Sequence, residues 1–227
     1  MTKLLDFLLP SSRGDLKGIA LEHLLCMSGS EEGCTFIGQR SDLLEAILGL
    51  MFDDSAVITK EVQKCMINLT ADEKVVRALL GLECSLKLRE VSLLLLQQCL
   101  DPQQTNAMVC NILTNMTRVP ECAVFVADLV LETQSLGLAS FVDTLCYLHA
   151  NKGATLTAVS TLLMNLTQVS RVRQGLMAPP AHLLLHLLPL ISLSSSLGSC
   201  RGIVGVCLLY TSPSPRDWLE SRMPSSA

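Results

Sequence analysis

Three asparagines stand two residues before a threonine, in the Asn-x-Thr pattern that accepts N-linked sugar: Asn68, Asn115 and Asn165. Glycosylation requires entry into the secretory pathway. The N-terminal stretch MTKLLDFLLPSS does not predict a signal peptide, because Asp6 and Pro10 interrupt an apolar run that is already too short. We therefore expect a cytoplasmic chain, with another role for the asparagines.

Two further patterns in the sequence are functional motifs in other proteins. Arg13-Gly14-Asp15 is an adhesion tripeptide in secreted proteins, but here it precedes an apolar helical run, and an acid such as Asp15 is favourable in a first helical turn. His182 and His186 have the spacing of a shared metal site, yet no third ligand lies nearby in the sequence. We expect a helix start in the first case and packing or a polar edge in the second.

The ten cysteines stand singly, with no Cys-x-x-Cys pair, and most of them fall in apolar runs where a thiol acts as a small core residue. This pattern favours a reducing compartment. The sequence also contains no Gly-rich phosphate loop, nucleophile elbow or acidic pair, so we expect no enzyme, cofactor or metal. A thiol enzyme, the alternative, requires a cysteine with a lowered pKa.

Composition favours an ordered all-α protein. Hydrophobic residues make up 49% of the 227 residues and aromatic residues only 4%. The net charge is −4 and the basic residues are scattered, which argues against a nucleic-acid partner. Residues 174–200 carry no charge, but Pro179, Pro180 and Pro189 favour a helix and loop over a membrane span.

The asparagines are spaced by 47 and 50 residues, and 42 residues before Asn68 the similar helix end HLLCMSG contains Cys26. Such a period is typical of solenoids built from two- or three-helix units. Apolar segments follow each asparagine at the same distance and are expected to begin the next unit: Val75–Leu80, Cys122–Ala127 and Val172–Met177. We predict an armadillo/HEAT-like, right-handed helical-repeat solenoid over residues 1–206.

Residues 207–227, CLLYTSPSPRDWLESRMPSSA, break from this helical pattern. They are identified as the translation of a sequencing-library adapter, and we treat them as an artefactual or disordered tail.

In a right-handed helical solenoid, the last helix of each unit lines the concave face, where an asparagine offers a donor and an acceptor to an extended peptide. Residues four positions earlier share the same helical face. The asparagines could instead satisfy a backbone group at their own helix end or a neighbouring turn, and one residue could do both. The candidate partner-binding residues are Asn68, Asn115, Asn165, Lys64, Asn111 and Thr161.

Three stretches resemble the HGH family, also called brain-protein-sixteen-like proteins: LLDFLLPSSRGDLKGIALEHLLCMSGSEEGC, the segment Leu138–Met177, and His186–Val206. The resemblance covers residues 1–206, departs from the family near Met177 where charged residues are missing, and reaches only the N-terminal part of the family's length. It implies an armadillo-like, non-enzymatic folding adaptor for elongation factor 2 that works with the cytosolic chaperonin.

Two other binding functions remain as alternatives. One is a generic helical-repeat scaffold. The other is a nuclear-import adaptor, whose asparagine ladders pair each Asn with a Trp four residues earlier. Here those positions hold Lys64, Asn111 and Thr161, and the only Trp is Trp218 in the tail, so recognition of basic peptides is disfavoured.

Overall fold

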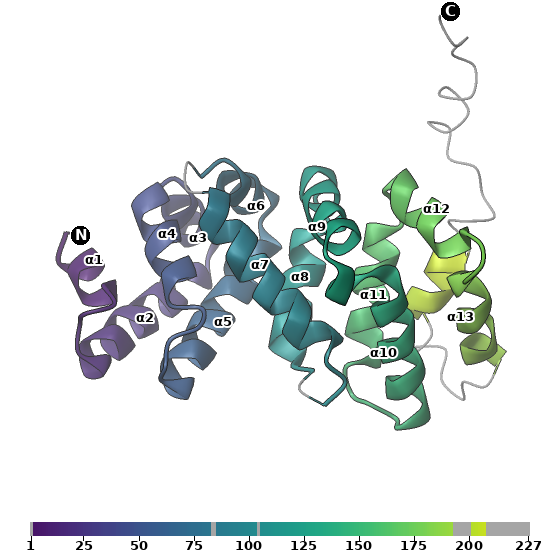
Figure 1. Cartoon of the computed structure of the whole chain (residues 1–227). Helices are drawn as coiled ribbons and strands as arrows, with labels where there is room; N and C mark the ends of the chain where they lie inside the picture. The colour runs from purple at the N-terminus through teal and green to yellow at the C-terminus, as the bar shows by residue number, and fades with distance from the viewer. Residues whose placement is uncertain (1, 83–84, 104, 193–200, 208–227) are drawn as a thin grey trace, which may run out of the picture.

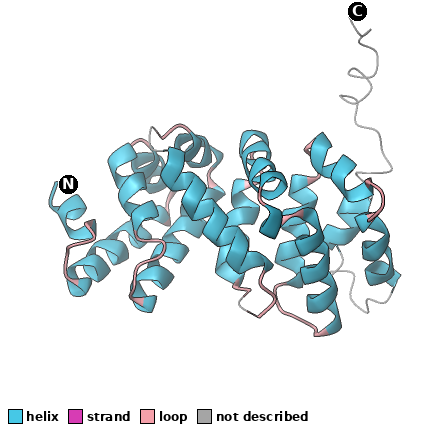
Figure 2. Ribbon diagram, in the orientation of Figure 1, coloured by secondary structure: helices cyan, strands magenta, loops and turns pink. Residues whose placement is uncertain are grey.

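The computed structural model describes residues 2–82, 85–103, 105–192 and 201–207. Within these ranges the regular structure is helical, with one short 3-10 turn and no strand (Figure 2). The prediction of an all-α protein is confirmed.

Figure 1 shows successive helices side by side along the length of the molecule. The described helices are α1 (Thr2–Leu8), α2 (Gly14–Ser28), α3 (Glu31–Gly38), α4 (Ser41–Gly49), α5 (Ala56–Ala71), α6 (Glu73–Leu80), α7 (Ser85–Leu100), α8 (Ala107–Met116), α9 (Pro120–Glu132), α10 (Leu138–Ala150), α11 (Leu156–Leu166), α12 (Ser170–Met177) and α13 (Leu183–Ser192), with the 3-10 turn η1 (Gln134–Leu136). Residues 201–207 form a further helical segment.

These helices repeat in threes. Helices α2, α5, α8 and α11 pack each on the next, and we call them the first row. Helices α1, α4, α7, α10 and α13 form a second row in the same way, and α3, α6 and α9 a third. Each unit thus contacts its neighbours along the chain, which confirms the helical-repeat solenoid.

The core runs continuously through the rows because each first-row helix turns its apolar residues inward. In α8, Val109, Ile112, Leu113 and Met116 are at most 1% exposed. Full burial of one such side chain contributes about 1.5–3 kcal/mol. Since a neighbouring unit covers each apolar face, the units stabilise one another.

Helices α6, α9 and α12 begin two residues before the apolar segments that were predicted to open them. Asp72 caps α6 by accepting a hydrogen bond from the Lys74 backbone N–H at 2.8 Å. Pro120 is the first residue of α9, where a missing N–H costs nothing. Local sequence therefore sets where α6 and α9 start.

The uncharged stretch contains the end of α12, α13 and residues outside the described ranges. Pro189 lies inside α13, and no helix in the described part of the chain is long and apolar enough to cross a membrane. Cys207, where the sequence predicts the tail to start, ends the helical segment 201–207, and residues 208–227 lie outside the description.

The segment 201–207 packs on α11, with Ile203 and Val206 buried. Gly202 lies against the backbone of Ser160, where a Cβ atom has no room, and Gly205 lies against the Met164 side chain. Glycine is required for this close approach.

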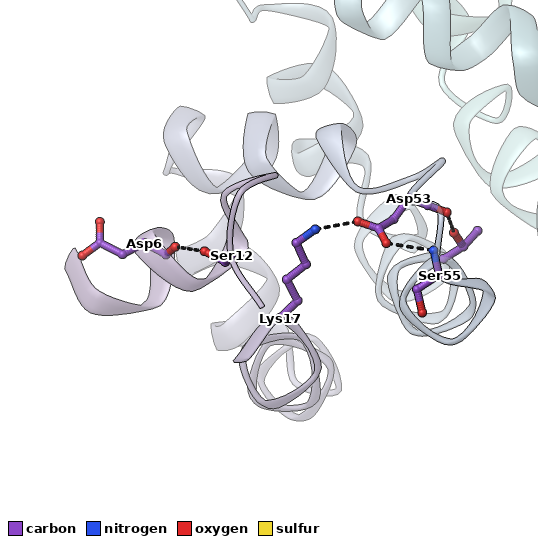
Figure 3. A network of polar contacts seen from close by, with 6 residues as sticks. Asp6, Ser12, Lys17, Asp53 and Ser55 are labelled. Atoms are coloured by element: carbon purple, nitrogen blue, oxygen red, sulfur yellow. Dashed lines mark hydrogen bonds and ion pairs between the residues drawn. The ribbon is translucent and has the colours of Figure 1, made fainter. Parts of the chain in front are cut away.

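The N-terminal helices are tied together by polar contacts (Figure 3). Lys17 Nζ lies 2.8 Å from Asp53 Oδ2, and their side chains are 9% and 14% exposed. The Ser55 backbone N–H donates to Asp53 Oδ1 at 3.0 Å. The hydrogen bond from Lys17 and the one from Ser55 lower the pKa of Asp53. This pair fixes α2 against the α4–α5 connection.

Candidate partner-binding surface

Asn68, Asn115 and Asn165 lie near the C-terminal ends of α5, α8 and α11, and all three are half-buried. The three helices are consecutive members of the first row. The repeat register therefore brings the asparagines to equivalent positions along one face of the solenoid.

Asn115 joins its helix to the preceding unit. Its side-chain Nδ2 donates to the backbone carbonyl oxygen of Ile67 at 3.2 Å and to Thr70 Oγ1 at 3.4 Å. Both acceptors lie at the end of α5, so the amide satisfies a carbonyl group at a helix terminus, where backbone oxygens lack intrahelical partners.

Asn165 repeats this geometry one unit later. Its Nδ2 donates to the carbonyl oxygen of Thr114 at 3.0 Å and to Thr117 Oγ1 at 3.2 Å. Asn68 makes the corresponding contact to the first unit, donating to Ser28 Oγ at 3.1 Å. These cross-unit contacts of Asn68, Asn115 and Asn165 are called the asparagine ladder below.

The hydroxyl groups of the ladder act as acceptors because their own protons are used elsewhere. Thr70 Oγ1 donates to the carbonyl oxygen of Met66 at 2.7 Å, and Thr117 Oγ1 donates to that of Leu113 at 2.8 Å. The Asn-x-Thr pattern thus has a structural explanation: the threonine of one unit accepts from the asparagine of the next.

Sequence reasoning missed the first acceptor of the ladder. Ser28 stands two residues after Cys26, the position that the repeat register matches to Asn68, so it takes the place of the threonine. Its hydroxyl donates to the carbonyl oxygen of Leu25 at 2.9 Å. The spacing carries this signal, because serine and threonine both place a hydroxyl group at this position.

Gln168 was also missed. Its Nε2 donates to the carbonyl oxygens of Thr117 at 2.9 Å and Asn165 at 2.7 Å, which adds a second cross-unit contact beside the ladder. The equivalent positions in earlier units hold Ala71 and Arg118, so no repeated residue pointed to it.

The residues four positions before each asparagine form no cross-unit bonds in the described chain. Lys64 Nζ contacts Glu61 Oε1 at 2.6 Å on its own helix, and Thr161 Oγ1 donates to the Thr157 carbonyl oxygen at 2.7 Å. Asn111 is exposed. These three side chains are therefore accessible to a partner and do not hold neighbouring units together.

Two open hollows adjoin the ladder. One, of about 450 Å³, is lined by Ser28, Glu31, Asn68, Asp72 and Lys74 among others. The other, of about 370 Å³, is lined by Glu73, Arg118, Met164, Asn165 and Gln168. Both mix acidic and basic side chains, so neither has the uniform charge of a phosphate or metal site.

Where a cysteine pKa shifts among the described residues, it is raised, whereas a thiol enzyme requires a lowered one. Burial raises the pKa of Cys65 to about 11 and that of Cys122 to about 12. The thiols of Cys99 and Cys110 lie 3.3 Å apart in the core, and the contact with Cys110 raises the pKa of Cys99 further. A raised pKa lowers the fraction of reactive thiolate.

The structure also shows where the Arg13-Gly14-Asp15 tripeptide and the histidine pair lie. Asp15 lies in the first turn of α2 and pairs with Arg13, which confirms the helix-start interpretation. His182 precedes α13, and its Nδ1 lies 3.0 Å from the Met177 carbonyl oxygen, while His186 lies within the helix. Both histidines are exposed, so packing in the core is not their role, and among the described residues no group of side chains could hold a metal.

Comparison with known proteins gives consistent relatives. The chain is 33% identical over 208 residues to a protein of Rattus norvegicus named Protein HGH1 homolog, covering 90% of this chain and 52% of the relative. The proteins of the same name from Danio rerio and Drosophila pseudoobscura pseudoobscura are 31% and 33% identical, covering 96% and 91% of this chain and 56% of each relative. The chain thus spans about half the length of the curated relatives it matches. No family model and no solved structure matches it.

Proposed function

This chain belongs to the HGH1 family, and from that premise we propose that it is part of a non-enzymatic folding adaptor in the cytoplasm. Its client is elongation factor 2, and it works with the cytosolic chaperonin. The solenoid surface holds the client while the chaperonin acts on it.

The observation that supports the binding function is the first row itself. Four helices pack in register, three of them (α5, α8 and α11) present asparagines at equivalent positions, and such repeated surfaces suit extended partners. The client-contact residues that we propose are Asn68, Asn115 and Asn165 with their neighbours Lys64, Asn111 and Thr161.

The proposed client contacts can be tested without disturbing the packing between units. Substituting Lys64, Asn111 and Thr161 together by alanine removes candidate contacts but leaves every ladder bond in place. Lys152→Ala is the matched control, because Lys152 is exposed and precedes α11, at the opposite end of that helix from Asn165. Circular dichroism checks that all variants remain folded.

The experiment is affinity capture from a translating eukaryotic extract with quantitative mass spectrometry. We expect the wild type and Lys152→Ala to recover elongation factor 2 and chaperonin subunits. The triple variant should recover about fivefold less, which corresponds to a loss of about 1 kcal/mol of contacts.

Each alternative outcome has a distinct meaning. Equal recovery by the triple variant keeps the function and moves the client to another surface. A wild-type capture without elongation factor 2 and chaperonin overturns the adaptor function and leaves a helical-repeat scaffold with a different partner. Capture of import substrates would favour the nuclear-import alternative.

A further inference from the structure

We propose that Cys99 and Cys110 form an oxidative modification site, at which a peroxide joins the two thiols into a reversible disulfide between α7 and α8. The inference goes beyond the proposed function and does not depend on it. Hydrogen peroxide is the simplest reagent of this class and is the probe used in the test below.

The two sulfur atoms are already in contact. Cys99 Sγ, near the C-terminal end of α7, lies 3.3 Å from Cys110 Sγ, near the start of α8. A disulfide brings two sulfur atoms to about 2.05 Å. A small movement of the two side chains can therefore bring them within bonding distance.

The other buried thiols are placed differently. Among the described residues, no other two cysteine sulfur atoms are in contact, although Cys34, Cys65 and Cys122 are also buried. The Cys34 thiol instead lies 3.1 Å from the Ser28 carbonyl oxygen, to which it donates. Burial alone thus does not pair the thiols, and the contact singles out Cys99 and Cys110.

The disulfide would close a short ring across one unit of the solenoid. Cys99 and Cys110 are 11 positions apart, and α7 and α8 pack against each other in the middle of the molecule (Figure 1). Closing such a ring removes conformations from the unfolded chain, which favours the folded state. Because α7 belongs to the second row and α8 to the first, oxidation would hold two rows of one unit together.

The fold controls when the pair can react. Both thiols are fully buried, so a peroxide reaches them only when the connection between α7 and α8 opens. In the closed state, the hydrogen bond with Cys110 and burial raise the pKa of Cys99, which keeps its thiol protonated and slow to react. Oxidation should therefore follow the opening of the connection.

Local hydrogen bonds hold this connection. Thr105 Oγ1 donates to the Asp101 carbonyl oxygen at 2.8 Å, and the Gln103 backbone N–H donates to Asp101 Oδ1 at 2.9 Å. Gln103 is exposed. Opening a surface loop of this kind costs less free energy than unfolding the whole chain.

The reaction balances with one molecule of peroxide. One thiol loses its proton and its sulfur attacks hydrogen peroxide: an S–O bond forms, the O–O bond breaks, and the leaving hydroxide takes up the proton as water. The second thiol then loses its proton and attacks the sulfenic acid, so that the S–S bond forms, the S–O bond breaks and a second water leaves. The two sulfur atoms lose two electrons and the peroxide gains them. Two molecules of a thiol such as glutathione reverse the reaction and leave as one glutathione disulfide.

A disulfide of this kind fits a chain that we expect in the cytoplasm. Disulfides there are kept reduced by glutathione and thioredoxin, and those that form are usually transient and respond to oxidants. The pair would thus be reduced under ordinary conditions and oxidised when peroxide rises.

The test is sequential thiol labelling of the whole, folded chain. The reduced protein is treated with hydrogen peroxide without denaturant and is then unfolded in a first alkylating reagent. Disulfides are next reduced, and the released thiols take a second reagent. Trypsin leaves Cys99 and Cys110 in one peptide, residues 90–118, because no Lys or Arg lies between Arg89 and Arg118. Mass spectrometry then reads both labels from the same peptide.

We expect this peptide to carry the second label on both cysteines, while Cys34, Cys65 and Cys122 carry the first. The first label on both cysteines, the second label on only one of them, or earlier oxidation of another pair would overturn the inference. So would a disulfide that forms only in denaturant. This measurement needs no variant and no client protein.

A variant tests the role of the connection. Thr105→Val removes the bond to Asp101, so the pair should oxidise about threefold to tenfold faster, the effect of one neutral hydrogen bond. Thr59→Val is the control, because Thr59 Oγ1 donates to the Asp53 carbonyl oxygen at 3.0 Å in the connection before α5. Circular dichroism checks that both variants are folded. Equal acceleration by both would show that global unfolding exposes the thiols and would contradict the site.

The oxidised chain should also resist unfolding. Closing a ring of this length should lower the equilibrium constant for unfolding on the order of a hundredfold, measured in urea before and after oxidation. Cys110→Ala cannot form the disulfide but keeps every methionine, so it accounts for methionine oxidation by the same treatment. Oxidised wild type that unfolds like its reduced form would contradict a stabilising disulfide between α7 and α8.

Discussion

Asn115 and Ile67 lie 48 residues apart in the sequence, and the side-chain amide of one donates to the backbone carbonyl oxygen of the other at 3.2 Å. Asn165 and Thr114 repeat this relationship one unit later. The ladder therefore stabilises the junction between units.

Removing a ladder amide should loosen the solenoid. Asn115→Ala leaves the Ile67 carbonyl oxygen and the Thr70 hydroxyl without their cross-unit donor, and we expect the free energy of unfolding to fall by about 1–3 kcal/mol. Chemical denaturation followed by circular dichroism measures it. Asn111→Ala, on the exposed side of the same helix, is the control and should cost under about 0.5 kcal/mol. Equal effects of the two would contradict a structural role for the ladder.

The Lys17–Asp53 pair should make stability depend on pH. The pKa of Asp53 is lowered in the folded chain, so its charge stabilises the fold at pH above the unfolded value of about 3.9. That contribution is lost as the pH falls through the lower folded value. The difference in unfolding free energy between wild type and Asp53→Asn should be largest at neutral pH and vanish in acid.

Denaturation curves measured from pH 3 to 7 check this. Asp54→Asn is the matched control, since Asp54 is exposed and forms no ion pair within the described residues. A difference for Asp53→Asn that stays constant across this range would show that the pair acts through shape and not through charge.

Two hydroxyl groups on the second row should behave in opposite ways. Ser92 on α7 is fully buried and its Oγ has no hydrogen-bond partner, whereas Thr144 Oγ1 on α10 donates to the Leu100 carbonyl oxygen at 2.8 Å. Ser92→Ala removes an unsatisfied polar group and should be neutral or stabilising by about 1 kcal/mol. Thr144→Val should destabilise by about 1–2 kcal/mol, because it leaves a buried carbonyl oxygen unpaired. Thermal melts of both variants measure these changes in stability. A destabilised Ser92→Ala variant would show that the Ser92 hydroxyl has a hydrogen-bond partner.

The glycine at the last described junction should be intolerant of a side chain. Gly202→Ala places a methyl group against the Ser160 backbone, so residues 201–207 should detach from α11 and exchange their amide hydrogens faster. Gly18→Ala is the control, because a Cβ atom there meets nothing within 4 Å. Alanine is favoured over glycine in a helix by about 1 kcal/mol, so the control should be neutral or more stable. Unchanged exchange in Gly202→Ala would mean that the junction can open without cost.

Much of the architecture could be predicted from sequence because its causes are local. Apolar spacing marks the buried face of each helix, and turn residues mark its ends. The repeat period alone predicted the starts of α6, α9 and α12. The start of α13 had no such signal in the spacing: the backbone at His182 has a positive φ, and the helix begins one residue later.

The role of the three asparagines could not be predicted from the sequence. The Asn-x-Thr sequence is the same whether the asparagine accepts a sugar, satisfies a group at the end of its own helix or forms a hydrogen bond to a neighbouring unit. Sequence alone determined that Asn68, Asn115 and Asn165 are equivalent, since equivalence is a matter of spacing. Only the tertiary structure decided that Ser28, Thr70 and Thr117 receive their amides, because acceptors 40 to 48 residues away are brought within 3.1–3.4 Å by the packing of one helix on the next.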